Sequence, residues 1–441
     1  MARELAPAEH ARIRRHLALI PAYICLVWCW IDLLSRLPIG PGSEAHLVRD
    51  FAAIAYVPGL IANQHDVHAL YDVDRRSAML AELLPSAPHV RYPPFYGPQM
   101  SVLFSPLARL PYGVALAVWM AITLVTYLGC AYLIWKVCPR LRDRAGTIFL
   151  VLLADPTLYY ALSFVQISAI ALACGTGGFL ALRANRPFLA GMFIGSLIYK
   201  PSLGVAFGIV LVCAALAGLA RPKLARDPSE RRLVLGAIAG AAAQLAVGAL
   251  FWGPSVLVDY VRAQLRLIPD MRDEFYLHHV HSWRGFFEIL GLPDAVAQTA
   301  YVIAASLVLA VALRGWRSGG PLAVRYAVLL VATVLVNPHG YVYDSLILMP
   351  AFLLLWDWSE ASRGRTVGDL VPAVPLAWLR TRSFTTTFEW LLYFCYFSPW
   401  FAIVAFVVRV QLSVPALSLL GLAAVGVLLR EDRRRVQPQP G

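Results

Sequence analysis

Long apolar segments without charge constrain this chain more than any other feature. Residues 233–252, 297–313 and 412–429 contain no Asp, Glu, Lys or Arg. A helix of about 20 apolar residues spans the hydrocarbon core of a bilayer. Across the chain, 59% of residues are hydrophobic, 15% are charged and the mean hydropathy is +0.64. Soluble domains carry about 25% charged residues, so the sequence predicts an all-α polytopic membrane protein.

The positive charge follows the connections between the apolar segments. The net charge is +12, and the arginines gather in short links, a pattern that orients helices and faces anionic lipid. We therefore expect membrane lipids as partners and no nucleic acid. With arginine-rich links inside, both termini lie inside and about twelve crossings result. The expected crossings cover residues 17–34, 113–136, 146–163, 166–182, 188–220 (crossing twice), 233–252, 297–313, 322–336, 341–357, 387–408 and 412–429.

This topology divides the chain without separate globular parts. We expect one transmembrane domain over residues 1–441. Residues 35–112 form a first outer loop, and 96–111 in it cannot cross, so they are expected to be an interfacial or re-entrant helix. Residues 253–296 form a second outer loop, and 430–441 form a basic tail on the inner side.

Three pairs of glycines at small-xxx-small spacing predict close helix packing. They are Gly191/Gly195, Gly204/Gly208 and Gly236/Gly240.

Polar residues concentrate on the outer side of the predicted topology. The segments 46–99, 155–166, 266–284 and 337–344 combine carboxylates, cations and aromatic rings. A carboxylate can act as a general base, and cations can stabilise a phosphate. Asp155, Lys200 and Asp344 lie at membrane depth or at outer helix ends. Lys200 is the foremost candidate, because a charge in that position is costly and usually functional; a lysine reaching out to the outer headgroups is the alternative.

The cluster His278, His279 and His281 admits three interpretations. Such adjacent spacing rarely places three imidazoles on one metal ion, so we expect no metal site. A phosphate-contacting or hydrogen-bonding role is favoured, and a solvated loop is the remaining reading.

An ordered set of short motifs resembles glycosyltransferase family 87, of the GT-C superfamily. The resemblance covers about residues 16–360, and no motif in it is specific alone. The set comprises Asp50-Phe51 with Tyr56, Leu70-Tyr71-Asp72, Tyr92-Pro93-Pro94, the run Leu103 to Pro111, Pro156 with Gln166, Gly191 with Tyr199-Lys200-Pro201, and Asn337-Pro338 with Tyr343.

The resemblance implies a GT-C-like helix bundle with interfacial helices on the outer face. It also implies transfer of a sugar from a polyprenyl-phosphate donor, since the family includes mannosyltransferases and arabinofuranosyltransferases. The chain departs from the family at Val165, where Gly is frequent before Gln166. It departs again at His281-Ser282 and at Tyr343. These departures bear on the identity of the donor sugar and the acceptor more than on the type of reaction.

We therefore expect a hexosyltransferase in the bacterial cytoplasmic membrane, acting on its periplasmic face. It would move one sugar, with mannose preferred, to a lipid or glycan acceptor, with inversion and without a cofactor. By resemblance, Asp50 is the catalytic base; the alternatives for Asp50 are an exposed interfacial acid or a salt bridge to Arg49. The expected donor and substrate residues are Arg91, Tyr92, Gln166, Lys200, His279, His281, Ser282, Arg284, His339 and Tyr343. A secondary transporter, a membrane scaffold or a glycan ligase would be the alternative functions.

Overall fold

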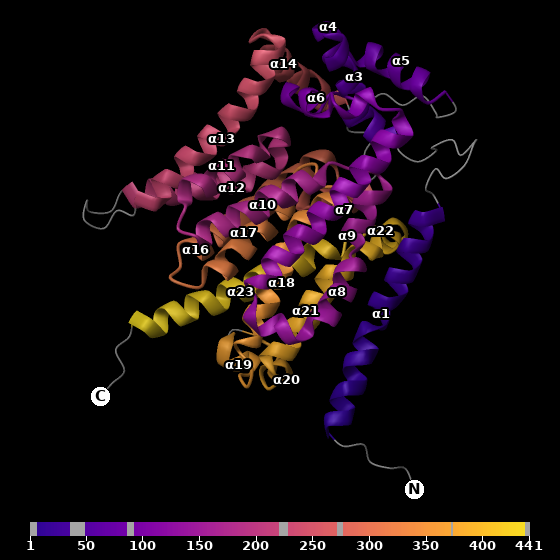
Figure 1. The fold of residues 1–441 in the computed structure, drawn as a ribbon. Coiled ribbons are helices and arrows are strands. Elements are labelled where there is room, and N and C mark those ends of the chain that lie inside the picture. The colour runs from indigo at the N-terminus through magenta and orange to yellow at the C-terminus, as the bar shows by residue number, and fades with distance from the viewer. Residues whose placement is uncertain are drawn as a thin grey trace.

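The computed structural model describes residues 7–35, 49–85, 92–219, 228–270, 277–371 and 374–436. Within these ranges the chain is helical apart from turns and two isolated bridges, Val280–Tyr341 and Thr366–Ser383. Figure 1 shows the long helices running alongside one another, with α3, α4, α5 and α6 at one end and α19 and α20 at the other.

The helices of the first half alternate between long spans and short pieces. They are α1 (Pro7–Ser35), α2 (Arg49–Phe51), η1 (Ala52–Tyr56), α3 (Val57–Gln64), α4 (Val67–Leu70), α5 (Val73–Leu83), α6 (Pro98–Phe104), η2 (Leu107–Arg109), α7 (Tyr112–Lys136), η3 (Pro139–Arg144), α8 (Ala145–Leu153), α9 (Pro156–Ser163), α10 (Ser168–Arg183), α11 (Pro187–Gly195), η4 (Ser196–Tyr199) and α12 (Pro201–Leu219).

The second half continues the same pattern. Its helices are α13 (Pro228–Trp252), α14 (Ser255–Asp270), η7 (Leu277–His279), α15 (Trp283–Ile289), α16 (Asp294–Trp316), α17 (Leu322–Val336), η8 (Val342–Leu348), α18 (Met349–Glu360), α19 (Val367–Leu370), α20 (Ala377–Arg380), α21 (Phe384–Phe397), η9 (Ser398–Phe401), α22 (Ala402–Val408) and α23 (Ser413–Val436).

Length and composition single out the helices able to cross a bilayer. In the described ranges five qualify: Tyr112–Lys136, Pro201–Gly218, Ser229–Trp252, Asp294–Trp316 and Ser413–Arg433. A bent pair, Pro139–Leu153 with Pro156–Ser163, makes a sixth if it is one span. The apolar helices Leu19–Ser35, Ser168–Arg183, Pro187–Tyr199 and Leu322–Val336 are shorter. The prediction of an all-helical membrane protein is confirmed. Helix length and composition by themselves account for five or six of the twelve predicted crossings in the described ranges.

Two glycine pairs hold α11 against α13. A Cβ on Gly191 or Gly195 would collide with the backbone of Leu233 or Ala237, and one on Gly236 or Gly240 would collide with the backbone of α11. These small residues let two helix backbones meet directly. The prediction for both pairs is confirmed.

The third glycine pair does not mediate close packing. A Cβ on Gly208 would meet nothing within 4 Å, and one on Gly204 would lie 3.9 Å from Leu197 Cβ. The prediction was wrong here, because the spacing alone does not say which helix face meets a neighbour.

Prolines break two helices where ionisable residues lie. Asp155 ends the α8 segment and caps α9, with Oδ1 accepting from Thr157 N at 2.7 Å. Lys200 has φ −131° and ψ 82° between η4 and α12. The residue before a proline avoids the helical region, so Pro201 places Lys200 outside both helices.

The links that the sequence predicts outside and inside the membrane contain more helix than a loop would. The segment 253–296 contains α14 and α15, and α6 is only seven residues long. Residues 430–436, predicted as tail, continue α23. Arg430 donates to Gly368 O at 3.2 Å and Glu431 pairs with Arg365 at 3.2 Å, which ties the end of α23 to α19.

Candidate active site

Asp50 is held through both of its carboxylate oxygens. Tyr92 Oη donates to Oδ1 at 2.8 Å, and Gln166 Nε2 donates to Oδ2 at 2.6 Å. Asp50 is half-buried in α2, just before η1, a π-helical turn of buried residues that begins at Ala52. π-helical turns occur frequently at functional sites. The predicted residues Asp50, Tyr92 and Gln166 therefore form one hydrogen-bonded group.

A tight turn between α9 and α10 positions Gln166. Gln166 N donates to Ala161 O at 2.9 Å and Val165 has φ 44°, which is a Schellman-type helix end. Glycine is usual at that left-handed position, and a β-branched residue there is strained. Trp119 Nε1 then donates to Gln166 O at 3.2 Å. The Val165 departure noted in the sequence thus lies at the turn that sets the Gln166 side chain.

Lys200 forms an ion pair with Asp344. The ammonium Nζ lies 2.6 Å from Asp344 Oδ1, and the exposed fractions of the two side chains are 13% and 1%. Ser168 Oγ donates to the same oxygen at 3.3 Å, and Tyr341 N donates to Oδ2 at 3.2 Å. Lys200 Nζ also lies 5.3 Å from the centre of the Tyr343 ring. A buried pair with these extra hydrogen bonds is a rigid group.

Tyr96 lies near both the Asp50 group and the Lys200 pair. Tyr96 stacks on Tyr199 with ring centres 6.3 Å apart. Burial raises the pKa of Tyr96. The charge of Lys200 lowers this pKa, and the carboxylates of Asp344 and Asp50 raise it further. All three charged groups therefore lie within electrostatic reach of one phenol. We call Asp50, Tyr96, Gln166, Lys200 and Asp344 the central cluster.

The turn between α9 and α10 also links the two carboxylates. Gln166 bonds to Asp50, and Ser168, two residues later, bonds to Asp344. A single short turn thus contacts both acids of the central cluster.

His339 lies beside the central cluster with Arg284. Arg284 Nη1 lies 3.4 Å from His339 Nδ1 and donates to Pro338 O at 3.2 Å. Burial, with the charges of Arg284 and Lys200, lowers the pKa of His339 to about 4. The ring is therefore neutral at pH 7, so it offers a substrate hydrogen bonds and no charge. Among the described residues, Lys200 and Arg284 are cations near His339, and Arg284 Nε also pairs with Glu288 Oε1 at 2.8 Å.

His279 lies against aromatic rings. Its ring centre lies 5.6 Å from that of Tyr160 and 6.2 Å from that of Phe164. Phe164 in turn contacts Tyr343 at 6.2 Å. Burial and His278 lower the pKa of His279 to about 4. His279 therefore packs at the side of the central cluster as a neutral ring.

His281 and Ser282 are fully buried on another side. His281 is 1% exposed and Ser282 is 0% exposed. His281 Nδ1 lies 2.6 Å from Ser413 Oγ, and His281 N donates to Gly340 O at 2.8 Å. Burial lowers the pKa of His281 to about 3. Contact of either side chain with a substrate would require the chain to open, so their placement argues for a structural role.

Arg91 lies outside the described residues. In the described part of the chain, no group of three or more His, Cys, Asp or Glu side chains has the arrangement of a metal site.

The residues that sequence reasoning left out are Asp344, Ser168 and Tyr96. Asp344 was named as an ionisable residue at a helix end but was not placed in the site. Its partner Lys200 lies 144 positions away. The cost of a carboxylate next to an apolar helix was the available signal. Ser168 and Tyr96 carried no such signal.

Comparison with known proteins agrees with the resemblance. The profile of glycosyltransferase family 87 matches residues 95–338, more than half of the chain. No curated protein and no solved structure matches. Tyr96, Gln166 and Lys200 lie inside the matched range, whereas Asp50 and Asp344 lie outside it. The chain is therefore a member of glycosyltransferase family 87, a membrane glycosyltransferase.

Proposed function

We propose that the protein transfers a single hexose, with mannose preferred, from a polyprenyl-phosphate donor to a hydroxyl of a lipid or glycan acceptor. Asp50 is the general base. The proposal rests on the hydrogen bonds that Tyr92 and Gln166 donate to Asp50, beside the Lys200–Asp344 pair.

The reaction is a single displacement at the anomeric carbon. The acceptor oxygen forms a bond to that carbon while the carbon–oxygen bond to the phosphate breaks. The acceptor proton passes to Asp50, and polyprenyl phosphate leaves with the bonding electron pair. Attack opposite the leaving group inverts the configuration of the sugar.

The geometry suits Asp50 to this role. Each carboxylate oxygen has two acceptor positions, and Tyr92 and Gln166 take one on each oxygen. A carboxylate oriented in this way can accept the proton of a substrate hydroxyl. Hydrogen bonds to the ionised form favour it and fix its direction, and orientation is part of what a general base requires.

Lys200 supplies positive charge for the leaving phosphate. An ammonium has three donors, and the bond to Asp344 uses one of them. Asp344 holds the ammonium in place, so the remaining donors are oriented before the donor lipid binds. Preorganised charge of this kind stabilises developing negative charge. Arg284 and His339 provide further donors nearby.

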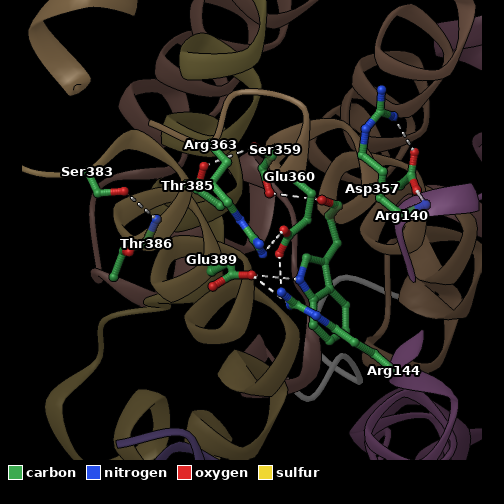
Figure 2. Close-up of polar contacts among 11 residues, drawn as sticks. Arg140, Arg144, Asp357, Ser359, Glu360, Arg363, Ser383, Thr385, Thr386 and Glu389 are labelled. Carbon is green, nitrogen blue, oxygen red and sulfur yellow. Dashed lines mark hydrogen bonds and ion pairs between the residues drawn. The ribbon is translucent and has the colours of Figure 1, made fainter. Parts of the chain in front are cut away.

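We also propose that the central cluster faces the periplasm of a bacterial cytoplasmic membrane. The end of the bundle that carries α19 and α20 also holds Arg140, Arg144 and Arg363 (Figures 1 and 2), in keeping with an inner face. The twelve crossings follow if α1, α10, α11 with η4, α17, η8 with α18, and α21 with α22 also span the bilayer. Cysteine labelling from either side of the membrane tests both the faces and the count.

The decisive experiment uses purified protein, radiolabelled polyprenyl-phosphate mannose and a membrane lipid extract. We expect Asp50→Asn to lower transfer by about 10²–10⁴-fold, the usual contribution of a general base. Asp74→Asn is the control, because Asp74 is an exposed acid of the same region.

Each outcome has a clear meaning. Near-normal transfer by Asp50→Asn would reject the base assignment. Transfer from another polyprenyl-phosphate sugar, and not from the mannose donor, would reject mannose alone. Activity only with a preassembled glycan donor would identify a ligase.

A further inference from the structure

Arg76 on α5 is a buried cation outside the central cluster. The residue is 7% exposed. Its guanidinium donates to two backbone carbonyls, with Nη2 2.6 Å from Ala53 O and Nη1 3.2 Å from Leu70 O. Among the described residues, no carboxylate pairs with it. Burial lowers the pKa of Arg76 to about 10, so the group is charged at pH 7. A buried charge without a partner of opposite sign is costly, so the two carbonyls must compensate for it.

The carbonyl of Ala53 belongs to η1, the π-helical turn just after α2. Val57 N donates to Ala52 O, a bond from residue i+5 to residue i, which defines the π register. In that register the next donor, to Ala53 O, would be the N–H of position 58. That position is Pro58, which has no N–H. Because Ala53 is buried, the guanidinium of Arg76 supplies the donor that the backbone lacks.

The register of η1 decides the direction in which Asp50 points. A π turn contains one residue more than the α-helical turn that would replace it. Relaxation to an α-helix would therefore rotate the preceding residues by about 100° about the helix axis, relative to α3. A rotation of that size would carry the Asp50 carboxylate away from Tyr92 and Gln166, which donate to it.

Local structure fixes the place of Arg76. Asp72 caps α5, with its side chain accepting from Arg75 N at 3.0 Å. Arg76 N donates to Asp72 O at 3.1 Å, so Arg76 lies in the first turn of α5. Arg76 and Tyr92 line one small hollow together with Ala53. The arginine thus lies beside both η1 and one of the side chains that hold the proposed base.

We propose that Arg76 is a positioning residue: its bond to Ala53 O holds η1 in the π register and so keeps Asp50 hydrogen-bonded to Tyr92 and Gln166. This inference rests on the proposed function for the role of Asp50 as the base. In this role Arg76 touches neither donor nor acceptor, so its removal should lower the rate of transfer and not the binding of the donor lipid.

The first test measures kcat and KM for the polyprenyl-phosphate mannose donor. Arg76→Met should lower kcat by about 10–10²-fold, the cost of misplacing a catalytic group, and should leave KM within about twofold of the wild type. Arg76→Lys should lose less, because an ammonium can still donate to one carbonyl. Arg75→Met is the control, because Arg75 is an exposed neighbour paired with Asp66, and it should transfer sugar at the normal rate.

The same substitution in an Asp50→Asn background separates positioning from a general loss of structure. A residue that acts through Asp50 should matter little once the carboxylate is gone. Adding Arg76→Met should therefore lower transfer by less than about twofold. A further loss of about tenfold in that background would overturn the proposal, as would wild-type kcat in Arg76→Met.

A cross-linking measurement reports the direction of position 50 without catalysis. Asp50→Cys with Gln166→Cys should be joined by a short thiol-specific cross-linker, since the two native side chains lie 2.6 Å apart. The single Asp50→Cys variant shows how much product the native cysteines give. Adding Arg76→Met should remove most of the specific product, whereas Arg75→Met should leave it.

The two measurements keep this inference apart from the proposed function. An unchanged cross-link with Arg76→Met would overturn the positioning role. Near-normal transfer by Asp50→Asn would reject the base assignment, and the cross-link would then decide by itself whether Arg76 sets the direction of Asp50. If Arg76→Met does not fold, Arg76→Lys takes its place in each measurement, with smaller losses of the same kind expected.

Discussion

The two buried ion clusters of this protein are balanced differently. In the Lys200–Asp344 pair of the central cluster, one ammonium meets one carboxylate, and Asp344 is 1% exposed. Between η3, α18 and α21, Arg144 shares its guanidinium between Glu360 and Glu389, and Glu389 is 33% exposed. The enclosed pair needs full internal compensation, because water cannot solvate either charge. The half-open cluster is partly exposed, so water can solvate part of its charge.

Removing one acid from each cluster should give the largest difference in stability between the two clusters. Asp344→Asn leaves the Lys200 ammonium without its partner in a closed site and should cost about 3–5 kcal/mol. Glu389→Gln should cost about 1 kcal/mol or less, because Arg144 keeps Glu360 and the group is partly solvated. Thermal unfolding in detergent measures both losses.

The paired replacement Lys200→Met with Asp344→Leu is the matched control. It removes both charges and should recover most of the stability while transfer stays low. Equal losses for Asp344→Asn and Glu389→Gln would show that enclosure does not distinguish the two clusters.

A second prediction concerns the helix that leads to Lys200. Gly195→Ala places a methyl group against the Ala237 backbone and should cost about 1–3 kcal/mol through overpacking. Transfer should fall as well, because α11 continues through η4 to Lys200. Gly208→Ala meets open space and should leave both stability and transfer unchanged or improved. A loss in Gly208→Ala of the same size would contradict the packing argument.

The smallest expected effect is at the turn that contacts both acids of the central cluster. Val165→Gly removes a β-branched residue from φ 44° and should raise stability by about 0.5–1 kcal/mol. Asn185 ends α10 in the same way at φ 55°, but asparagine tolerates that conformation. Asn185→Gly should therefore change the free energy of unfolding little. Chemical denaturation of the two variants measures this difference. A gain in Asn185→Gly equal to that in Val165→Gly would reject strain as the cause.

Local chemistry explains which features were predictable. The helix break at Lys200-Pro201 follows from proline, and the packing of Gly191 and Gly195 follows from small residues at one spacing. The same spacing failed at Gly204 and Gly208, because it carries no information about the partner helix. For His281 the sequence left open whether the ring contacts a phosphate or forms a hydrogen bond within the protein, and the structure shows a hydrogen bond to Ser413.

The sequence by itself determined the membrane class, the family resemblance and the residues Asp50, Gln166 and Lys200 as candidates. These conclusions rest on composition, periodicity and short motifs, which are local properties of the chain. Only the tertiary structure decided that Tyr92 and Gln166 hold opposite oxygens of Asp50 and that Asp344 neutralises Lys200. It also brought Arg144 to Glu360 and Glu389. These contacts join residues that are far apart in the chain, so they depend on how the helices pack.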